Sequence, residues 1–283
     1  IKAYEKAIEI NPKDEKAWNN KGVGLLKLKR YEEAIKTSEK AIEINPKNAV
    51  AWNNKGASLG ELKRYKGAIN AFEKAIEINP KDVEAWNNKG VSLGELNRYE
   101  EAENAFEEAI KINPKYAKAW FSKAFYLGEL KRYKEAIKFY EKAIEINPKY
   151  DKAWFNKGNE LAKLKRHEEA IKAFEKAIEI NPNDDKAWHN KGVGFSNLKR
   201  YEEAIKASEK AIEINPNDDK AWYTKGAYLT NLKRYEEAIK SFEKAIEINP
   251  NDDKAWHYKG YCLTNLKRYE EAIKASEKAI EIN

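Results

Sequence analysis

The stretch Ala85-Trp86-Asn87-Asn88-Lys89-Gly90 decides the fold, because variants of it recur eight times along the chain. Its tryptophan returns every 34 residues, and a proline always precedes that tryptophan by six residues. These positions account for every tryptophan of the chain: Trp18, Trp52, Trp86, Trp120, Trp154, Trp188, Trp222 and Trp256. A constant period of this length indicates an array in which each repeat is one supersecondary unit.

Two amphipathic helices are predicted within the repeat at residues 83–116. The prolines at 80 and 114 exclude one continuous helix through those points. At 100° per residue, a first helix from about Val83 to Leu96 has one buried stripe, formed by Trp86, Gly90, Leu93 and Leu96. A second helix from about Tyr99 to Ile112 has its stripe at Ala102, Phe106, Ala109 and Ile110.

One helix pair cannot cover its own apolar stripe, so neighbouring pairs are expected to stack. Residues 1–14 supply a second helix only, and 253–283 form a last repeat without a separate capping helix. Complete repeats are expected at 15–48, 49–82, 83–116, 117–150, 151–184, 185–218 and 219–252, so that 1–283 forms one array. We read the chain as part of a longer protein. Uncapped ends favour end-to-end self-association, which sedimentation at high protein concentration would test.

Composition excludes several classes of protein. The chain is 36% charged but 42% apolar, which argues against a disordered polyelectrolyte. The net charge of +7 comes from alternating signs, with no basic block of the kind that binds nucleic acid. No apolar run is long enough to span a bilayer. Cys262 is the only cysteine, so no intrachain disulfide forms, and we expect a cytoplasmic location.

The repeat resembles the tetratricopeptide repeat (TPR) family at the positions Trp86, Gly90, Leu93, Tyr99, Ala102, Phe106, Ala109 and Pro114. The resemblance covers the whole chain. It implies an all-α, right-handed superhelical solenoid of tandem antiparallel helix pairs, with the first helices lining a concave wall. In the middle repeat that wall would carry Glu84, Asn87, Asn88, Val91 and Glu95. It also implies a non-enzymatic scaffold that binds a protein or an extended peptide.

No catalytic residue, cofactor site or metal site is predicted. His189 and His257 stand two repeats apart on first helices, and a zinc site needs three or four converging ligands. Cys262 has no base near it in the sequence. The Asn-Asp-Asp runs at 183–185, 217–219 and 251–253 could suggest calcium, but an aspartate just before a helix is expected to cap it.

An asparagine two residues after the tryptophan is the first candidate ligand-binding feature. It is present in five of the first six repeats, as Asn20, Asn54, Asn88, Asn156 and Asn190. This row is similar to the asparagine ladder inside the TPR superhelix of O-linked N-acetylglucosamine transferase, which holds extended peptide backbone. An amide both donates and accepts, so it can bind a peptide group without reading its side chain. The alternative is that these asparagines only solvate the groove.

Aromatic and basic side chains are further candidates on the concave wall. The residue after each tryptophan changes from asparagine, as in Asn87, to larger rings. With two neighbouring rings this gives the anchor candidates Phe121, Phe125, Phe155, His189, Tyr223, His257 and Tyr261. The alternative is that the rings fill seams between first helices. A basic row two residues before the tryptophan favours an acidic ligand, unless it is merely solvated: Lys118, Lys152, Lys186 and Lys220.

The chaperone-type carboxylate clamp of the TPR family is matched only in part. Asn159, Asn190 and Lys220 match three of its members, whereas Phe155 and Thr224 stand where the clamp needs a lysine and an arginine. We therefore do not expect binding of chaperone C-terminal tails.

Two questions stay open at this stage. A lysine follows every tryptophan by three residues, as in Lys89, at the edge of the buried stripe. Its ammonium either reaches into water or pairs with a glutamate of an adjacent second helix. The scaffold function has two alternatives, an RNA-binding helical-repeat protein, which acidic residues on the wall make unlikely, and a structural module of a larger protein.

Overall fold

The computed structural model describes all 283 residues and contains seventeen α-helices and no strand. The helices are α1 (Lys2–Ile10), α2 (Glu15–Lys27), α3 (Tyr31–Ile44), α4 (Ala49–Glu61), α5 (Tyr65–Ile78), α6 (Val83–Glu95), α7 (Tyr99–Ile112), α8 (Ala117–Glu129), α9 (Tyr133–Ile146), α10 (Asp151–Lys163), α11 (His167–Ile180), α12 (Asp185–Asn197), α13 (Tyr201–Ile214), α14 (Asp219–Asn231), α15 (Tyr235–Ile248), α16 (Asp253–Asn265) and α17 (Tyr269–Ile282). None of them is both long enough and apolar enough to span a membrane. The chain forms two compact units, unit 1 (Ile1–Pro148) and unit 2 (Lys149–Asn283).

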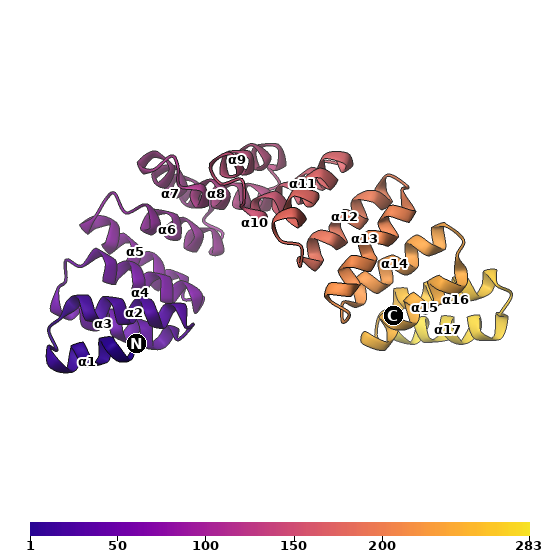
Figure 1. Cartoon of the computed structure of the whole chain (residues 1–283), viewed down its shortest axis with the longest axis horizontal. Helices are drawn as coiled ribbons and strands as arrows, with labels where there is room; N and C mark the ends of the chain where they lie inside the picture. The colour runs from indigo at the N-terminus through magenta and orange to yellow at the C-terminus, as the bar shows by residue number, and fades with distance from the viewer. The chain divides into compact units, whose positions relative to one another are not determined.

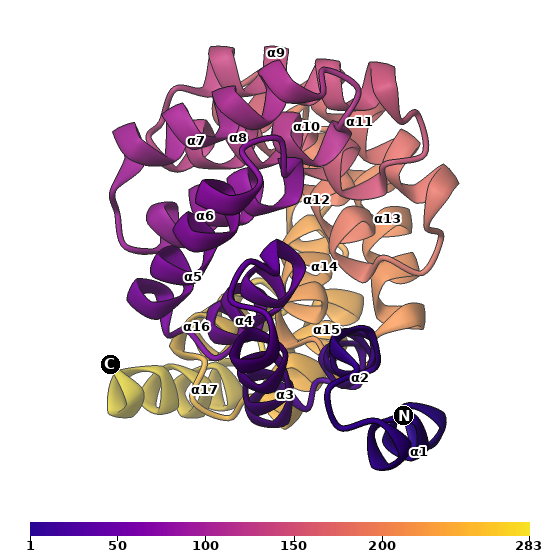
Figure 2. The same ribbon diagram turned by 90° about the vertical axis from the view of Figure 1, so that its left-hand side faces the viewer.

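Each unit is a stack of antiparallel helix pairs, as the periodicity predicts (Figure 1). Within a unit, each first helix (even number) packs on its own second helix and on the second helix before it. Successive first helices also touch one another, as α4, α6 and α8 do, whereas successive second helices do not. Figure 2 shows α6 and α8 on the inner side of α7 and α9. The first helices therefore form the inner wall of each stack.

A hydrogen bond explains why tryptophan and proline share one period. The Trp86 indole Nε1–H donates to the Pro80 carbonyl oxygen at 3.0 Å. The same bond, six residues back, is made by Trp18, Trp52, Trp120, Trp188, Trp222 and Trp256. Each tryptophan thus binds the turn that leads into its own helix while its ring stays half-buried. This fixes the direction in which each repeat begins.

Local signals begin and end the first helices. Asp82 caps α6, with its carboxylate accepting from the Ala85 amide at 3.0 Å. The predicted capping role of the Asn-Asp-Asp runs is confirmed, because Asp184, Asp218 and Asp252 cap their helices in the same way. The C-terminal turns are Schellman motifs centred on a residue with positive φ. At Lys63 (φ 58°) the amide donates to the Gly60 carbonyl at 2.8 Å.

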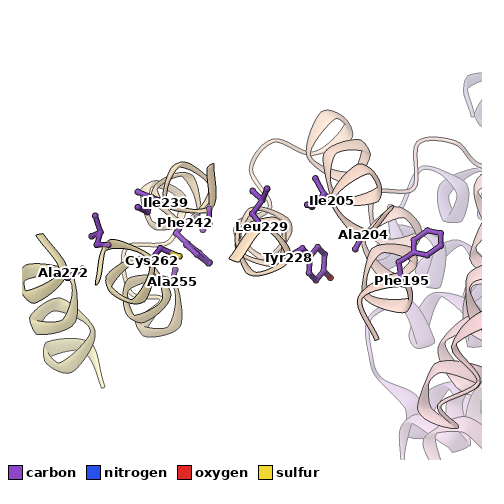
Figure 3. Close-up of a cluster of buried hydrophobic side chains, with 14 of the residues drawn as sticks. Phe195, Ala204, Ile205, Tyr228, Leu229, Ile239, Phe242, Ala255, Cys262 and Ala272 are labelled. Atoms are coloured by element: carbon purple, nitrogen blue, oxygen red, sulfur yellow. The ribbon is translucent and has the colours of Figure 1, made fainter. Parts of the chain in front are cut away.

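The hydrophobic core runs along the stack and has no single centre. In unit 2 one continuous cluster extends from Ile171 on α11 to Ala275 on α17, and Figure 3 shows its part from Phe195 to Ala272. Glycines let the paired helices approach closely within this core. A Cβ built on Gly90 would lie 2.6 Å from the Phe106 ring, closer than a side-chain carbon can come. Each repeat buries part of its apolar stripe against the next repeat. The stability of a repeat therefore depends on the repeats adjacent to it.

Successive first helices meet along a seam, which is the line of contact between neighbouring repeats on the inner wall. At this seam the side chains that face each other are matched in size. A residue eight after one tryptophan faces a residue six after the next. A Cβ built on Gly60 would lie 3.9 Å from the Ser92 hydroxyl, but one on Gly94 would lie 2.3 Å from the Tyr126 ring. In unit 2 the Thr230 hydroxyl and the Cys262 thiol lie 3.2 Å apart in a hydrogen bond. Each seam is therefore specific for its own pair of side chains.

For seven of the eight tryptophans, the lysine three residues later forms an ion pair with a glutamate of the preceding second helix. Lys89 Nζ lies 2.9 Å from Glu73 Oε1 and 5.6 Å from the centroid of the Trp86 ring. Equivalent ion pairs are Lys21–Glu5, Lys55–Glu39, Lys123–Glu107, Lys191–Glu175, Lys225–Glu209 and Lys259–Glu243. The interpretation that these ammonium groups reach only into water is wrong. The glutamates are about half exposed, so each pair contributes about 1 kcal/mol or less.

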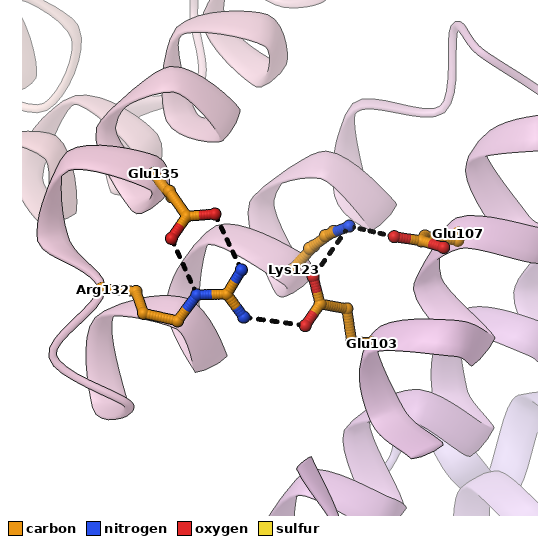
Figure 4. Close-up of polar contacts among 5 residues, drawn as sticks. All are labelled: Glu103, Glu107, Lys123, Arg132 and Glu135. Carbon is orange, nitrogen blue, oxygen red and sulfur yellow. Dashed lines mark hydrogen bonds and ion pairs between the residues drawn. The ribbon is translucent and has the colours of Figure 1, made fainter. Parts of the chain in front are cut away.

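Glu103 is an exception to the sequence pattern, because the other repeats all have isoleucine at its position. Figure 4 shows how the structure accommodates it. Its carboxylate lies 3.2 Å from Lys123 Nζ and 2.9 Å from Arg132 Nη1. Lys123 also contacts Glu107 at 2.6 Å, and only 6% of its side chain is exposed. A charge within an otherwise apolar stripe is therefore part of a paired network.

Candidate functional site

A groove of about 590 Å³ lies on the inner wall of unit 1. The side chains that the helical register predicts for this wall come from positions two before and two, five and nine after the tryptophan, which fall within 60° of one another. Four of the five predicted wall residues of α6 line the groove: Glu84, Asn88, Val91 and Glu95. Asn54 and Glu61 join them from α4, Tyr65 from α5, and Lys118 from α8.

Asn87 does not belong to this groove, which corrects its predicted place on the concave wall. Its exposed fraction is 0%, and its side-chain amide donates to the Asn88 side chain at 3.3 Å. The reason is its angle, because a residue directly after the tryptophan lies only 100° from that buried ring. In α6 this residue faces the helix seam, whereas Asn53, at the same position of α4, lines the groove.

The predicted asparagine ladder is only partly assembled. Asn54 and Asn88, one repeat apart, share the groove. The Asn54 side-chain nitrogen is buried and has no hydrogen-bond partner. In unit 2, Asn156 donates to the Lys152 carbonyl at 2.9 Å, and Asn190 donates to Asn159 at 2.9 Å. Asn20 is exposed on α2 and does not line the groove.

Tyrosine hydroxyl groups orient two of the groove's glutamates, a feature that the sequence reasoning missed. Tyr31 donates to Glu61 at 3.1 Å, and Tyr65 donates to Glu95 at 3.2 Å. Tyr126 donates to Glu95 at 2.9 Å from the other side. Burial, together with the hydrogen bond to Glu95, raises the pKa of Tyr126, so the hydroxyl stays a donor. The sequence pattern that could have revealed these hydrogen bonds is a tyrosine 30 residues before each of Glu61 and Glu95.

The predicted aromatic anchors are half-buried in some repeats and exposed in others. Phe121, Phe155 and Tyr223 each contact a ring of their own second helix, with centroid distances of 5.7–5.9 Å. Tyr223 also contacts Tyr258 on the next first helix at 5.9 Å, and burial raises its pKa to about 12. The exposed rings on first helices include Phe125, His257 and Tyr261.

The remaining polar candidates are distributed over both units. Burial lowers the pKa of the half-buried His189. The predicted basic row is exposed throughout: Lys118, Lys152, Lys186 and Lys220. Among the residues that match the carboxylate clamp, the structure brings Asn159 and Asn190 together by their hydrogen bond.

Comparison with known proteins gives repeated matches to one family. The tetratricopeptide repeat model matches residues 15–48, 49–82, 83–116, 117–150 and 151–184, and a second tetratricopeptide model matches 173–206. The model of anaphase-promoting complex, cyclosome, subunit 3 matches residues 197–279. A comparison with curated protein sequences found no match.

Solved structures with similar folds include other repeat proteins. YrrB, described as a TPR protein with an unusual peptide-binding site, is 26% identical, with a TM-score of 0.54 over 66% of this chain and 97% of that one. The C-terminal part of a TPR repeat-containing protein from Cytophaga hutchinsonii is 18% identical, with a TM-score of 0.67 over 84% and 97%. PilF from Pseudomonas aeruginosa is 20% identical, with a TM-score of 0.63 over 71% and 92%. The five tandem matches cover more than half of the sequence, and the chain belongs to the tetratricopeptide repeat family.

Proposed function

We propose that the chain is a non-enzymatic scaffold that binds an extended peptide segment in the groove of unit 1. The observation that carries this proposal is the pair Asn54 and Asn88, which stand at the same position of successive repeats and line one groove. The buried Asn54 amide nitrogen has no partner within the chain. A peptide carbonyl is the kind of acceptor that would satisfy it.

The spacing of the two amides suits main-chain recognition. The first helices α4 and α6 are in contact, so their axes lie about 8–10 Å apart. An extended chain covers that distance in about three residues at 3.3–3.6 Å each. Amides repeated at this interval bind backbone groups and tolerate different side chains. The similarity to YrrB, whose description names a peptide-binding site, supports this mode of binding.

The test is an array of extended peptides about twelve residues long, probed with the full chain and its variants. We expect Asn54→Ala combined with Asn88→Ala to weaken binding at least tenfold, because two backbone hydrogen bonds are lost. The matched control is Asn20→Ala, which changes the same repeat position outside the groove and should leave binding unchanged. Equal binding by the double variant and the unaltered chain would disprove the proposal.

Three narrower expectations belong to this proposal. The exposed lysine row of unit 2 (Lys152, Lys186 and Lys220) would suit an acidic segment. End-to-end self-association stays a prediction, for which Ile273 and Ile280 on α17, 58% and 76% exposed, are candidate contacts. The cytoplasmic location also stays a prediction.

A further inference from the structure

The groove of unit 1 is lined by more acidic than basic side chains, whereas the inner wall of unit 2 is basic at the equivalent repeat positions. At the positions two before and nine after the tryptophan, the repeats at 49–82 and 83–116 have Val50, Glu61, Glu84 and Glu95. The same positions in unit 2 have Lys152, Lys163, Lys186, Asn197, Lys220, Asn231, Lys254 and Asn265, with no acidic residue. The contrast is local, because the whole chain has a net charge of +7.

The groove of unit 1 is rich in hydrogen-bond acceptors without a cationic partner. Glu61, Glu84 and Glu95 line it, and none of the three forms an ion pair within the chain. Two lysines also line it, but Lys63 lies in the turn after α4 and Lys118 in the first turn of α8. Both are exposed.

A second and independent observation points the same way. Asn53 lines the groove, and its side-chain oxygen is buried without a hydrogen-bond partner. Asn19 and Asn87, at the same position of the neighbouring repeats, also have a buried side-chain oxygen without a partner, but neither lines the groove. A buried acceptor is costly to leave unsatisfied, so the Asn53 oxygen in the groove favours a ligand or water that donates.

The glutamates are also held in place before any ligand arrives. Tyrosine hydroxyls bind Glu61 from one side and Glu95 from two sides. These hydrogen bonds reduce the conformational freedom of the carboxylates that a cation would otherwise have to restrict. Glu61 and Glu95 occupy equivalent positions on α4 and α6, so their spacing corresponds to about three residues of an extended chain.

We propose that the groove of unit 1 selects an extended peptide segment with Lys or Arg side chains three residues apart. This inference rests on the proposed function. Asn54 and Asn88 hold the main chain, and Glu61 and Glu95 receive one cationic side chain each. An acidic segment would meet the same carboxylates with repulsion, which gives the groove its selectivity.

The experiment uses fluorescence anisotropy with the full chain and three Gly/Ser-based probes twelve residues long. One probe has two lysines three positions apart, one has two glutamates at the same places, and one has two adjacent lysines. At 150 mM salt, where screening acts over about 8 Å, we expect the first probe to bind at least tenfold more tightly than the second. The third should be weaker than the first. The net charge of +7 would by itself favour the acidic probe.

Glu61→Gln combined with Glu95→Gln should abolish the preference for the lysine probe. Glu129→Gln is the matched control, since Glu129 occupies the same repeat position on α8 but does not line the groove. Circular dichroism would verify that the variants fold. Equal binding of the lysine and glutamate probes, with both weakened by Asn54→Ala and Asn88→Ala, would overturn the inference and leave peptide binding intact. Binding that ignores the asparagines would overturn both.

Discussion

Gly94→Ala is expected to destabilise the chain by about 1–3 kcal/mol, the usual cost of forcing one carbon into a filled core. The added Cβ would lie 2.3 Å from the ring of Tyr126, a residue only 8% exposed. The ring cannot move away freely, because its hydroxyl donates to Glu95 at 2.9 Å and to the Val91 carbonyl at 3.1 Å. Relief therefore requires α6 and α8 to separate. Urea unfolding followed by circular dichroism would measure the loss.

Gly60→Ala is the matched control, because Gly60 stands at the same repeat position one repeat earlier. Its Cβ would lie 3.9 Å from the Ser92 hydroxyl, which is ordinary contact. We expect no loss, and a gain of up to about 1 kcal/mol from the better helix former. Adding Tyr126→Ser to Gly94→Ala should recover part of the stability. A Gly94→Ala variant as stable as the Gly60→Ala variant would contradict the size-matching account of the seam.

Lys123→Ala is expected to cost about 2–3 kcal/mol, because it removes a nearly buried lysine that pairs with the carboxylates of both Glu103 and Glu107. Glu103 would keep only Arg132, and the space of the lysine stem would be left empty. The expected loss of stability is smaller than for breaking a fully buried ion pair, because Glu107 is 56% exposed. Since a repeat array need not unfold in one step, hydrogen exchange of the α7 and α8 amides should accompany the urea transition.

Lys55→Ala is the control for that prediction. Lys55 has the same repeat position but is 24% exposed and pairs with Glu39 alone, so we expect a loss of about 1 kcal/mol or less. Adding Glu103→Ile to Lys123→Ala should restore most of the stability, because it replaces a carboxylate that has lost one of its two cationic partners with an apolar side chain. Equal losses at the two lysines would show that the network around Glu103 contributes nothing beyond one surface pair.

The periodicity predicted the helices closely but not the contacts that join them. The second helix of the middle repeat was expected over Tyr99–Ile112 and is observed there, since an apolar stripe and two prolines define it locally. The indole bond from Trp86 to Pro80 was not predicted, although both residues were prominent. Their contact depends on how the turn between Pro80 and α6 folds back toward the indole ring, and the side-chain types alone do not specify that geometry.

Prediction from the sequence was limited in the same way for the residues that line the groove. Asn88 and Glu95 could be placed by helical angle, because both lie near the middle of the exposed arc. Asn87 could not, since it lies at the edge of the arc, where a neighbouring helix decides between water and burial. The partner of the lysine three residues after each tryptophan could not be predicted for the same reason. Whether Lys89 meets Glu73 depends on the offset between adjacent helices, and the sequence of one repeat does not contain that offset.

The seam between first helices has a consequence for how the gene could change. Nearly identical repeats invite unequal recombination, which would delete, duplicate or transpose modules. A module with a large ring at the position of Tyr126 follows a repeat with a small residue at the position of Gly94, which is Gly94 itself before Tyr126 and Ser196 before the equivalent ring of Tyr228. Transposing residues 117–150 to follow 219–252 would place the larger Thr230 against Tyr126, and we expect that joint to fit less well. Copies that look interchangeable are in this way limited in the neighbours that they accept.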